Sequence, residues 1–105
     1  MYNKVKDKIT NGVELDTLGK KSKFSAIFVN GNIEITNSKG SICTFTKKDF
    51  DVIKARFDSG GKNSCKASYY ARKNTIGWEK SEGNPSPDFS GYIAAIINAI
   101  NLGKL

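Results

Sequence analysis

Cations and aromatic rings are interleaved in one stretch of this chain, residues 62–80. Its sequence, KNSCKASYYARKNTIGWEK, sets Tyr69, Tyr70 and Trp78 among five lysine and arginine residues. Aromatic rings stack on bases and cations neutralise phosphates, so this combination is typical of a nucleic-acid-binding surface. The whole chain agrees in sign, because seventeen Lys and Arg stand against ten Asp and Glu, a net charge of +7. The composition therefore predicts a polyanionic partner.

Within this basic aromatic stretch, Arg72 is the best candidate for a base contact, because its planar guanidinium can bond guanine through two N–H groups. A second basic cluster, residues 20–23, precedes a predicted strand. It is interpreted either as a phosphate contact or, preferably, as a solvated loop that keeps a strand edge soluble. The predicted nucleic-acid-binding residues are Lys62, Lys66, Tyr69, Arg72, Lys73, Trp78, Lys80, Lys20, Lys21 and Lys23.

The chain contains no histidine, which removes the usual general base near neutral pH and the most frequent zinc ligand. Its acids are scattered. Asp49 and Asp51 lie about 200° apart around a predicted helix, so they would not share a metal ion. We therefore predict no catalytic residue, no metal and no cofactor. An enzyme that cleaves RNA with Lys, Arg and Tyr alone, as some small ribonuclease toxins do, is the remaining catalytic alternative.

Cys43 and Cys65 are too few for a disulfide scaffold or a four-thiolate zinc site, so both are predicted to be reduced. No apolar run follows the charges of the first residues, as it would in a signal peptide. The longest apolar segment, residues 92–100, is much shorter than the roughly 20 residues that cross a bilayer. We expect a soluble, cytoplasmic protein that does not bind membranes.

The apolar spacing predicts a short helix at the start of the chain, with a further helical turn over residues 13–18. Residues 23–29 and 32–36 read as two strands joined by Asn30-Gly31, a strong hairpin signal. A turn at 37–40 and alternation over 42–46 add a third strand. The result is a three-stranded antiparallel β-meander.

A helix is predicted over residues 47–58, because Thr46 and Asp49 have capping-box spacing and glycines follow Asp58. The basic aromatic stretch itself fits either a helix, which is favoured, or a strand. A last helix begins near Pro87 and ends at Gly103, and its broad apolar face must join the core, as is favoured, or cover a partner subunit. The predicted core includes Phe50, Ile53, Phe57, Ile93, Ile96 and Ile100.

Together these elements predict a single α+β domain over residues 1–105. If 64–73 is a helix, residues 46–74 resemble a helix-turn-helix with the meander in the position of a wing. The hypothesis from sequence is a non-catalytic nucleic-acid-binding protein, with DNA preferred to RNA as its partner. The alternative is a small inhibitor or adaptor that binds an acidic or nucleic-acid-processing protein.

Overall fold

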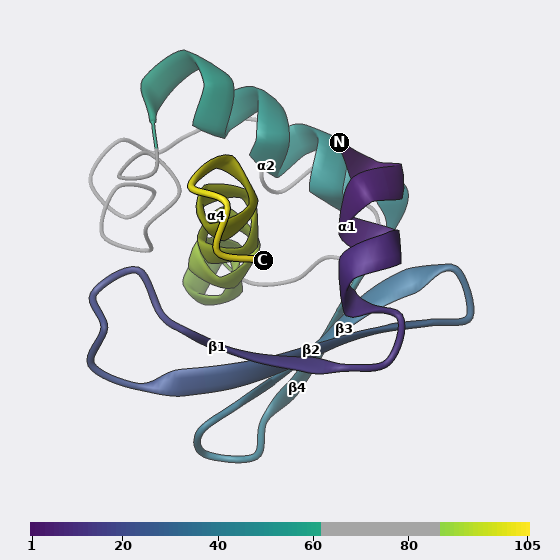
Figure 1. The fold of residues 1–105 in the computed structure, drawn as a ribbon, viewed down its shortest axis with the longest axis vertical. Helices are drawn as coiled ribbons and strands as arrows, with labels where there is room; N and C mark the ends of the chain where they lie inside the picture. Colours follow the sequence, from purple (N-terminus) through teal and green to yellow (C-terminus); the bar gives the residue numbers. More distant parts are fainter. Residues whose placement is uncertain (62–86) are drawn as a thin grey trace.

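A computed structural model describes residues 1–61 and 87–105 of the chain. Within these residues, three helices lie over one face of a four-stranded antiparallel sheet, and α4 runs between α2 and the sheet (Figure 1). The protein is thus a small α+β domain, as predicted. In chain order its elements are α1 (Tyr2–Ile9), β1 (Val13–Asp16), β2 (Lys23–Val29), β3 (Asn32–Asn37), β4 (Ile42–Phe45), α2 (Lys47–Gly60) and α4 (Pro87–Asn101).

The sheet has one more strand than predicted. Residues 13–16 form the edge strand β1, where the sequence analysis expected a further helical turn. β1 pairs antiparallel with β2, so that Val13 lies opposite Ala26 and Leu15 opposite Phe24. This register places both apolar residues of β1 toward the helices and leaves its two acids facing outward. Pairing with β2 therefore decides the conformation of a segment too short to specify its own.

The predicted β-hairpin is confirmed. Asn30 and Gly31 both adopt positive φ, 52° and 79°. A two-residue hairpin turn of this kind has a backbone twist that matches the right-handed twist of the two strands it joins. Ile33 and Ile35 on β3 are fully buried, as their alternation with polar residues predicted. The predicted third strand corresponds to β4, which ends at Phe45 because Thr46 leaves the sheet to cap α2.

The capping box of α2 is confirmed in both directions. The Asp49 N–H donates to the Thr46 hydroxyl at 3.2 Å, and the Thr46 N–H donates to the Asp49 carboxylate at 3.0 Å. At the other end Gly61, with φ 75°, donates its N–H to the Phe57 carbonyl at 2.8 Å. The helix predicted over 47–58 therefore runs through Gly60 before a left-handed glycine ends it.

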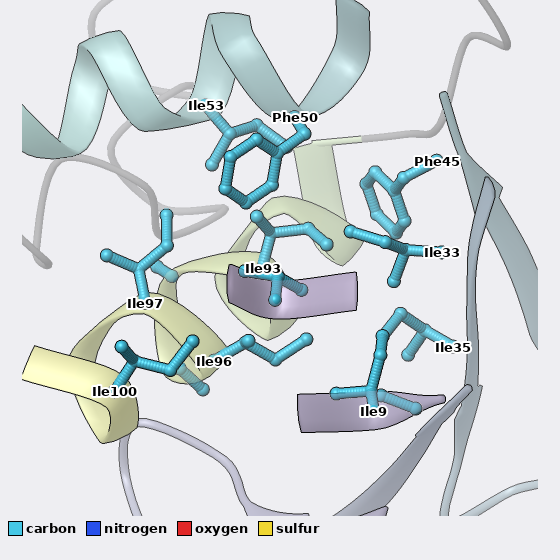
Figure 2. Close-up of a cluster of buried hydrophobic side chains, with 14 of the residues drawn as sticks. Ile9, Ile33, Ile35, Phe45, Phe50, Ile53, Ile93, Ile96, Ile97 and Ile100 are labelled. Carbon is cyan, nitrogen blue, oxygen red and sulfur yellow. The ribbon is translucent and has the colours of Figure 1, made fainter. Parts of the chain in front are cut away.

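The core lies between the inward face of the sheet and α2, and α4 passes through its centre (Figure 2). Ile93, Ile96 and Ile97 of α4 have no exposed surface. This confirms that the broad apolar face of the last helix serves the core. The predicted core residues that the structure describes are buried, except that Phe57 is only partly buried at the margin.

The helix-turn-helix interpretation depends on residues 64–73, which lie outside the described residues. The choice between helix and strand for the basic aromatic stretch also falls there. Both stay predictions.

Candidate functional site

Seven of the ten predicted nucleic-acid-binding residues lie outside the described part of the chain: Lys62, Lys66, Tyr69, Arg72, Lys73, Trp78 and Lys80. The other three, Lys20, Lys21 and Lys23, lie in the β1–β2 loop and at the first position of β2. All three side chains are exposed. β2 lies between β1 and β3, so the strand after the cluster has no open edge to protect. The preferred structural reason for these lysines, protection of a strand edge, does not hold for β2.

The β1–β2 loop is held by its own backbone. The Thr17 N–H donates to the Ser22 carbonyl at 3.0 Å, and the Lys20 N–H donates to the Thr17 carbonyl at 2.9 Å. Lys20 takes a positive φ of 57°, which is uncommon for a residue other than Gly, Asn or Asp. Lys23 pairs across the strands with Asp16 at 3.3 Å, with both side chains more than half exposed. Such a pair contributes little to stability, so Lys23 is partly neutralised while Lys20 and Lys21 extend into solvent.

The outward face of the sheet, here called the open face, carries little positive charge. The strand registers place three acids there and a single lysine, Lys23. None of its outward positions holds an aromatic ring. Three large aliphatic side chains, Ile27, Val29 and Ile42, are exposed on it. The outward positions are Glu14, Asp16, Lys23, Ser25, Ile27, Val29, Asn32, Glu34, Thr36, Ile42 and Thr44.

The opposite side, here called the basic side, consists of α1, α2 and the β1–β2 loop, which curls toward the helices (Figure 1). Its acids with exposed side chains are Asp7, Asp51 and Asp58. Asp51 pairs with Lys47 at 3.0 Å, and Asp58 pairs with Lys54 at 2.6 Å. Cations outnumber acids on this side, and they are Lys4, Lys6, Lys8, Lys20, Lys21, Lys47, Lys48, Lys54 and Arg56. The described charges are thus sorted by side.

An aromatic cluster on the basic side was not anticipated from sequence. The Tyr2 ring meets Phe28 and Phe50 edge to face, with centroids 5.7 and 5.3 Å away. Lys6 Nζ lies 5.6 Å from the centroid of the Phe28 ring, and Lys47 Nζ lies 5.9 Å from that of Tyr2. No local spacing in the sequence signals these contacts, because the three rings come from three different elements and each lysine lies over a ring of another element than its own.

This cluster has a packing role. The Tyr2 hydroxyl donates to the Gly31 carbonyl at 2.8 Å, which ties α1 to the tip of the β2–β3 hairpin. Burial and then the negative charge of Asp51 raise the pKa of Tyr2, so the hydroxyl stays a donor. Because its rings already pack against one another, the cluster is a joint between α1, β2 and α2 and offers no free platform for bases.

The described residues contain no group of three side chains of the kinds that bind a metal ion. Cys43 faces inward from β4, and burial, followed by the charge of Asp49, raises the pKa of its thiol to about 11. A thiol of that pKa is protonated near neutral pH and is a poor nucleophile. Cys43 is therefore not an activated nucleophile in this fold.

No protein-family model, no curated protein and no solved structure matches this chain. In the segments that the structure describes, no helix has both the length and the apolar character needed to span a bilayer. The functional argument therefore depends on the residues and on their geometry.

Proposed function

We propose that the protein is a non-catalytic nucleic-acid-binding protein of the cytoplasm, with DNA preferred to RNA. The interface comprises the basic aromatic stretch 62–80, Lys20 and Lys21 of the β1–β2 loop, and the adjoining Lys23, which is the first residue of β2 and lies at the margin of the open face. The observation that carries the proposal is the sorting of charge between the basic side and the open face. A polyanion is attracted to the basic side, whereas the acids of the open face repel it.

The arrangement of the chain supports the same interface. The C-terminal end of α2 and the β1–β2 loop lie on the same side of the molecule, at the left of Figure 1. The basic aromatic stretch continues the chain from that end of α2. In the winged helix-turn-helix form of the proposal, residues 64–73 are the recognition helix and Arg72 contacts a base edge. The open face, with three acids and no ring, is unsuited to the sheet-surface binding of single strands.

The test is fluorescence anisotropy with labelled duplex DNA, single-stranded DNA and RNA at two salt concentrations. Each phosphate that the protein neutralises should contribute about −0.9 to the log–log salt slope on duplex DNA. Duplex DNA should bind most tightly, and binding should weaken steeply as salt increases. Absence of binding to all three probes at low salt would overturn the proposal.

The second candidate function is a protein-binding adaptor or inhibitor, and the exposed Ile27, Val29 and Ile42 of the open face favour it. Exposed aliphatic side chains gathered on one face suit a protein partner better than a phosphate backbone. A salt-insensitive interaction that is lost on Ile42→Asp, with no binding to nucleic acid, would establish this alternative.

A further inference from the structure

A cleft with a volume of about 310 Å³ lies between β1, the β1–β2 loop and the last turns of α4. This volume is at the lower end of the range for small-molecule sites, roughly 300–1,000 Å³. Its apolar lining comes from both walls, with Leu15 and Leu18 on one side and Ala99 and Leu102 on the other. Among the lining residues that the structure describes, none is aromatic. From these described walls, a ligand in the cleft would meet aliphatic groups rather than a ring on which a base can stack.

Three described lysines line the cleft: Lys20, Lys23 and Lys104. Two of them, Lys20 and Lys104, come from opposite walls, and backbone geometry positions both. Lys20 is fixed in the left-handed conformation by the hydrogen bonds of its loop. Lys104 follows Gly103, whose φ is 72°, and donates its N–H to the Ala99 carbonyl at 2.8 Å. With the bond from the Gly103 N–H to the Ile100 carbonyl, this is a Schellman motif that closes α4. Both lysines therefore start from ordered backbone.

The charges that line the cleft favour a monoanion. Glu14 and Asp16 also line it, and Asp16 is already paired with Lys23. Apart from the Asp16–Lys23 pair, the described charges that line the cleft are Lys20, Lys104 and Glu14, which leaves one positive charge in excess. A carboxylate would neutralise this excess, whereas a doubly charged phosphate monoester would leave negative charge uncompensated.

From the shape, lining and charge of this cleft, we propose that it binds a carboxylate carried on a short aliphatic body. The carboxylate lies between Lys20 and Lys104, and the aliphatic body packs on Leu15, Leu18 and Ala99. This chemistry is shared by a free branched-chain carboxylic acid and by the C-terminal residue of a peptide. The site is separate in chemistry from the nucleic-acid interface, although it shares Lys20 and Lys23 with it.

The primary experiment titrates isotopically labelled protein with isocaproate and follows the backbone amide resonances by NMR. Saturable shifts should appear at Leu18, Lys20 and Lys104. A peptide ending in leucine, with a free or an amidated C-terminus, separates the two sources. Shifts from isocaproate assign a free acid, and shifts from the free peptide alone assign a peptide terminus. Absence of saturable shifts with isocaproate and with the free peptide would overturn the proposal.

Variants distinguish this cleft from general attraction of anions. Lys20→Asn removes a lining charge and keeps a residue that tolerates positive φ, so affinity should fall about two- to fivefold. Lys21→Asn, in the same loop but outside the cleft, should leave the affinity unchanged. Equal effects of the two would show only a general charge effect and would overturn the proposal, as would equal binding of inorganic phosphate.

Ala99→Leu fills the cleft from α4 and should abolish the saturable shifts while leaving DNA binding unchanged. Loss of ligand binding with DNA binding retained would show that the cleft and the nucleic-acid interface act separately. If the parent protein does not bind DNA at all, the ligand titration still tests the cleft. If a folded Ala99→Leu protein binds the ligand as tightly as the parent protein does, the ligand does not occupy this cleft and the proposal is wrong. If that variant does not fold, the Lys20→Asn and Lys21→Asn pair still decides the question.

Discussion

The basic side and the open face of this small domain differ in charge and in apolar exposure. The basic side carries most of the described lysines, and none of the large apolar side chains of α1, α2 or the β1–β2 loop is exposed. On the open face the balance is reversed, with three acids, one paired lysine and three exposed aliphatic side chains. The two proposals assign these surfaces to different partners, a polyanion on the basic side and a protein on the open face.

The separation of charge between the two sides bears on how the domain attracts partners. Charges of both signs that are interspersed over a surface keep it soluble without creating a large field of one sign. Segregated charges create a directional field, which steers charged partners.

The largest effect is expected from the core between the two surfaces. Ile96→Ala removes a fully buried side chain of α4 and should lower the free energy of unfolding by about 2–5 kcal/mol. The matched change Ile42→Ala, on the open face, should alter it by less than about 0.5 kcal/mol, because Ile42 is 63% exposed. Urea denaturation measures both. Comparable losses would show that the open face is covered in solution.

The elements of this fold that the sequence predicts well are those with local signals. α2 has a capping box and a glycine stop, and the hairpin has Asn30-Gly31. β1 was missed because Val13 and Leu15 are too few to distinguish a period of two from a helical turn. Its strand conformation comes from pairing with β2, an interaction between segments that the period of a single segment does not contain.

The next effect concerns the basic aromatic stretch. If this stretch is helical, Tyr70 faces the core and Tyr69 lies beside Lys66 and Lys73. Tyr69→Ala should then weaken nucleic-acid binding by about 1–3 kcal/mol with little loss of stability, because a stacked base loses its platform. Anisotropy and thermal unfolding are the two measurements. Tyr70→Ala is the matched control and should mainly destabilise the fold, so the reverse pattern would contradict the helical period.

The site is less predictable from sequence than the fold, and the reason is physical. Lysine clusters look alike in sequence whether they contact a phosphate or only water, since nothing in their spacing records the opposite charges nearby. The pairing of Lys23 with Asp16 depends on the β1–β2 register. The cleft depends on the packing of α4 against β1, and Lys104 enters it through a helix cap that the sequence analysis did not connect with a site.

A third prediction tests which residues of β4 face inward. With a thiol pKa of about 11, against an ordinary 9.0, the folded protein should react with iodoacetamide at Cys43 at least about tenfold more slowly than the unfolded chain near pH 8. A Cys65→Ser background isolates the thiol, and mass spectrometry follows the reaction. Fast alkylation of the folded protein would place Cys43 on the open face.

The raised pKa of Cys43 also makes the stability of the protein depend on pH. The folded state keeps the Cys43 proton to higher pH than the unfolded state, so the neutral thiol contributes stability below about pH 9. This contribution should decline as the pH rises from 9 to about 11. Cys43→Ser should lose less stability over that window than the parent protein, as measured by urea denaturation at each pH.

The smallest effect compares single lysines at two turns of the sheet. Lys21 lies in the β1–β2 loop of the basic side, whereas Lys39 lies in the β3–β4 turn. Both are exposed, so Lys21→Gln and Lys39→Gln change the net charge equally. If Lys21 contacts a phosphate, its loss should reduce the steepness of the log–log salt dependence of duplex DNA binding by about 0.9. Lys39→Gln should leave the slope unchanged, because a charge outside the interface releases no additional counterions. Equal changes in slope would mean that DNA responds to the total charge of the protein, and the division into a basic side and an open face would then have no role in binding.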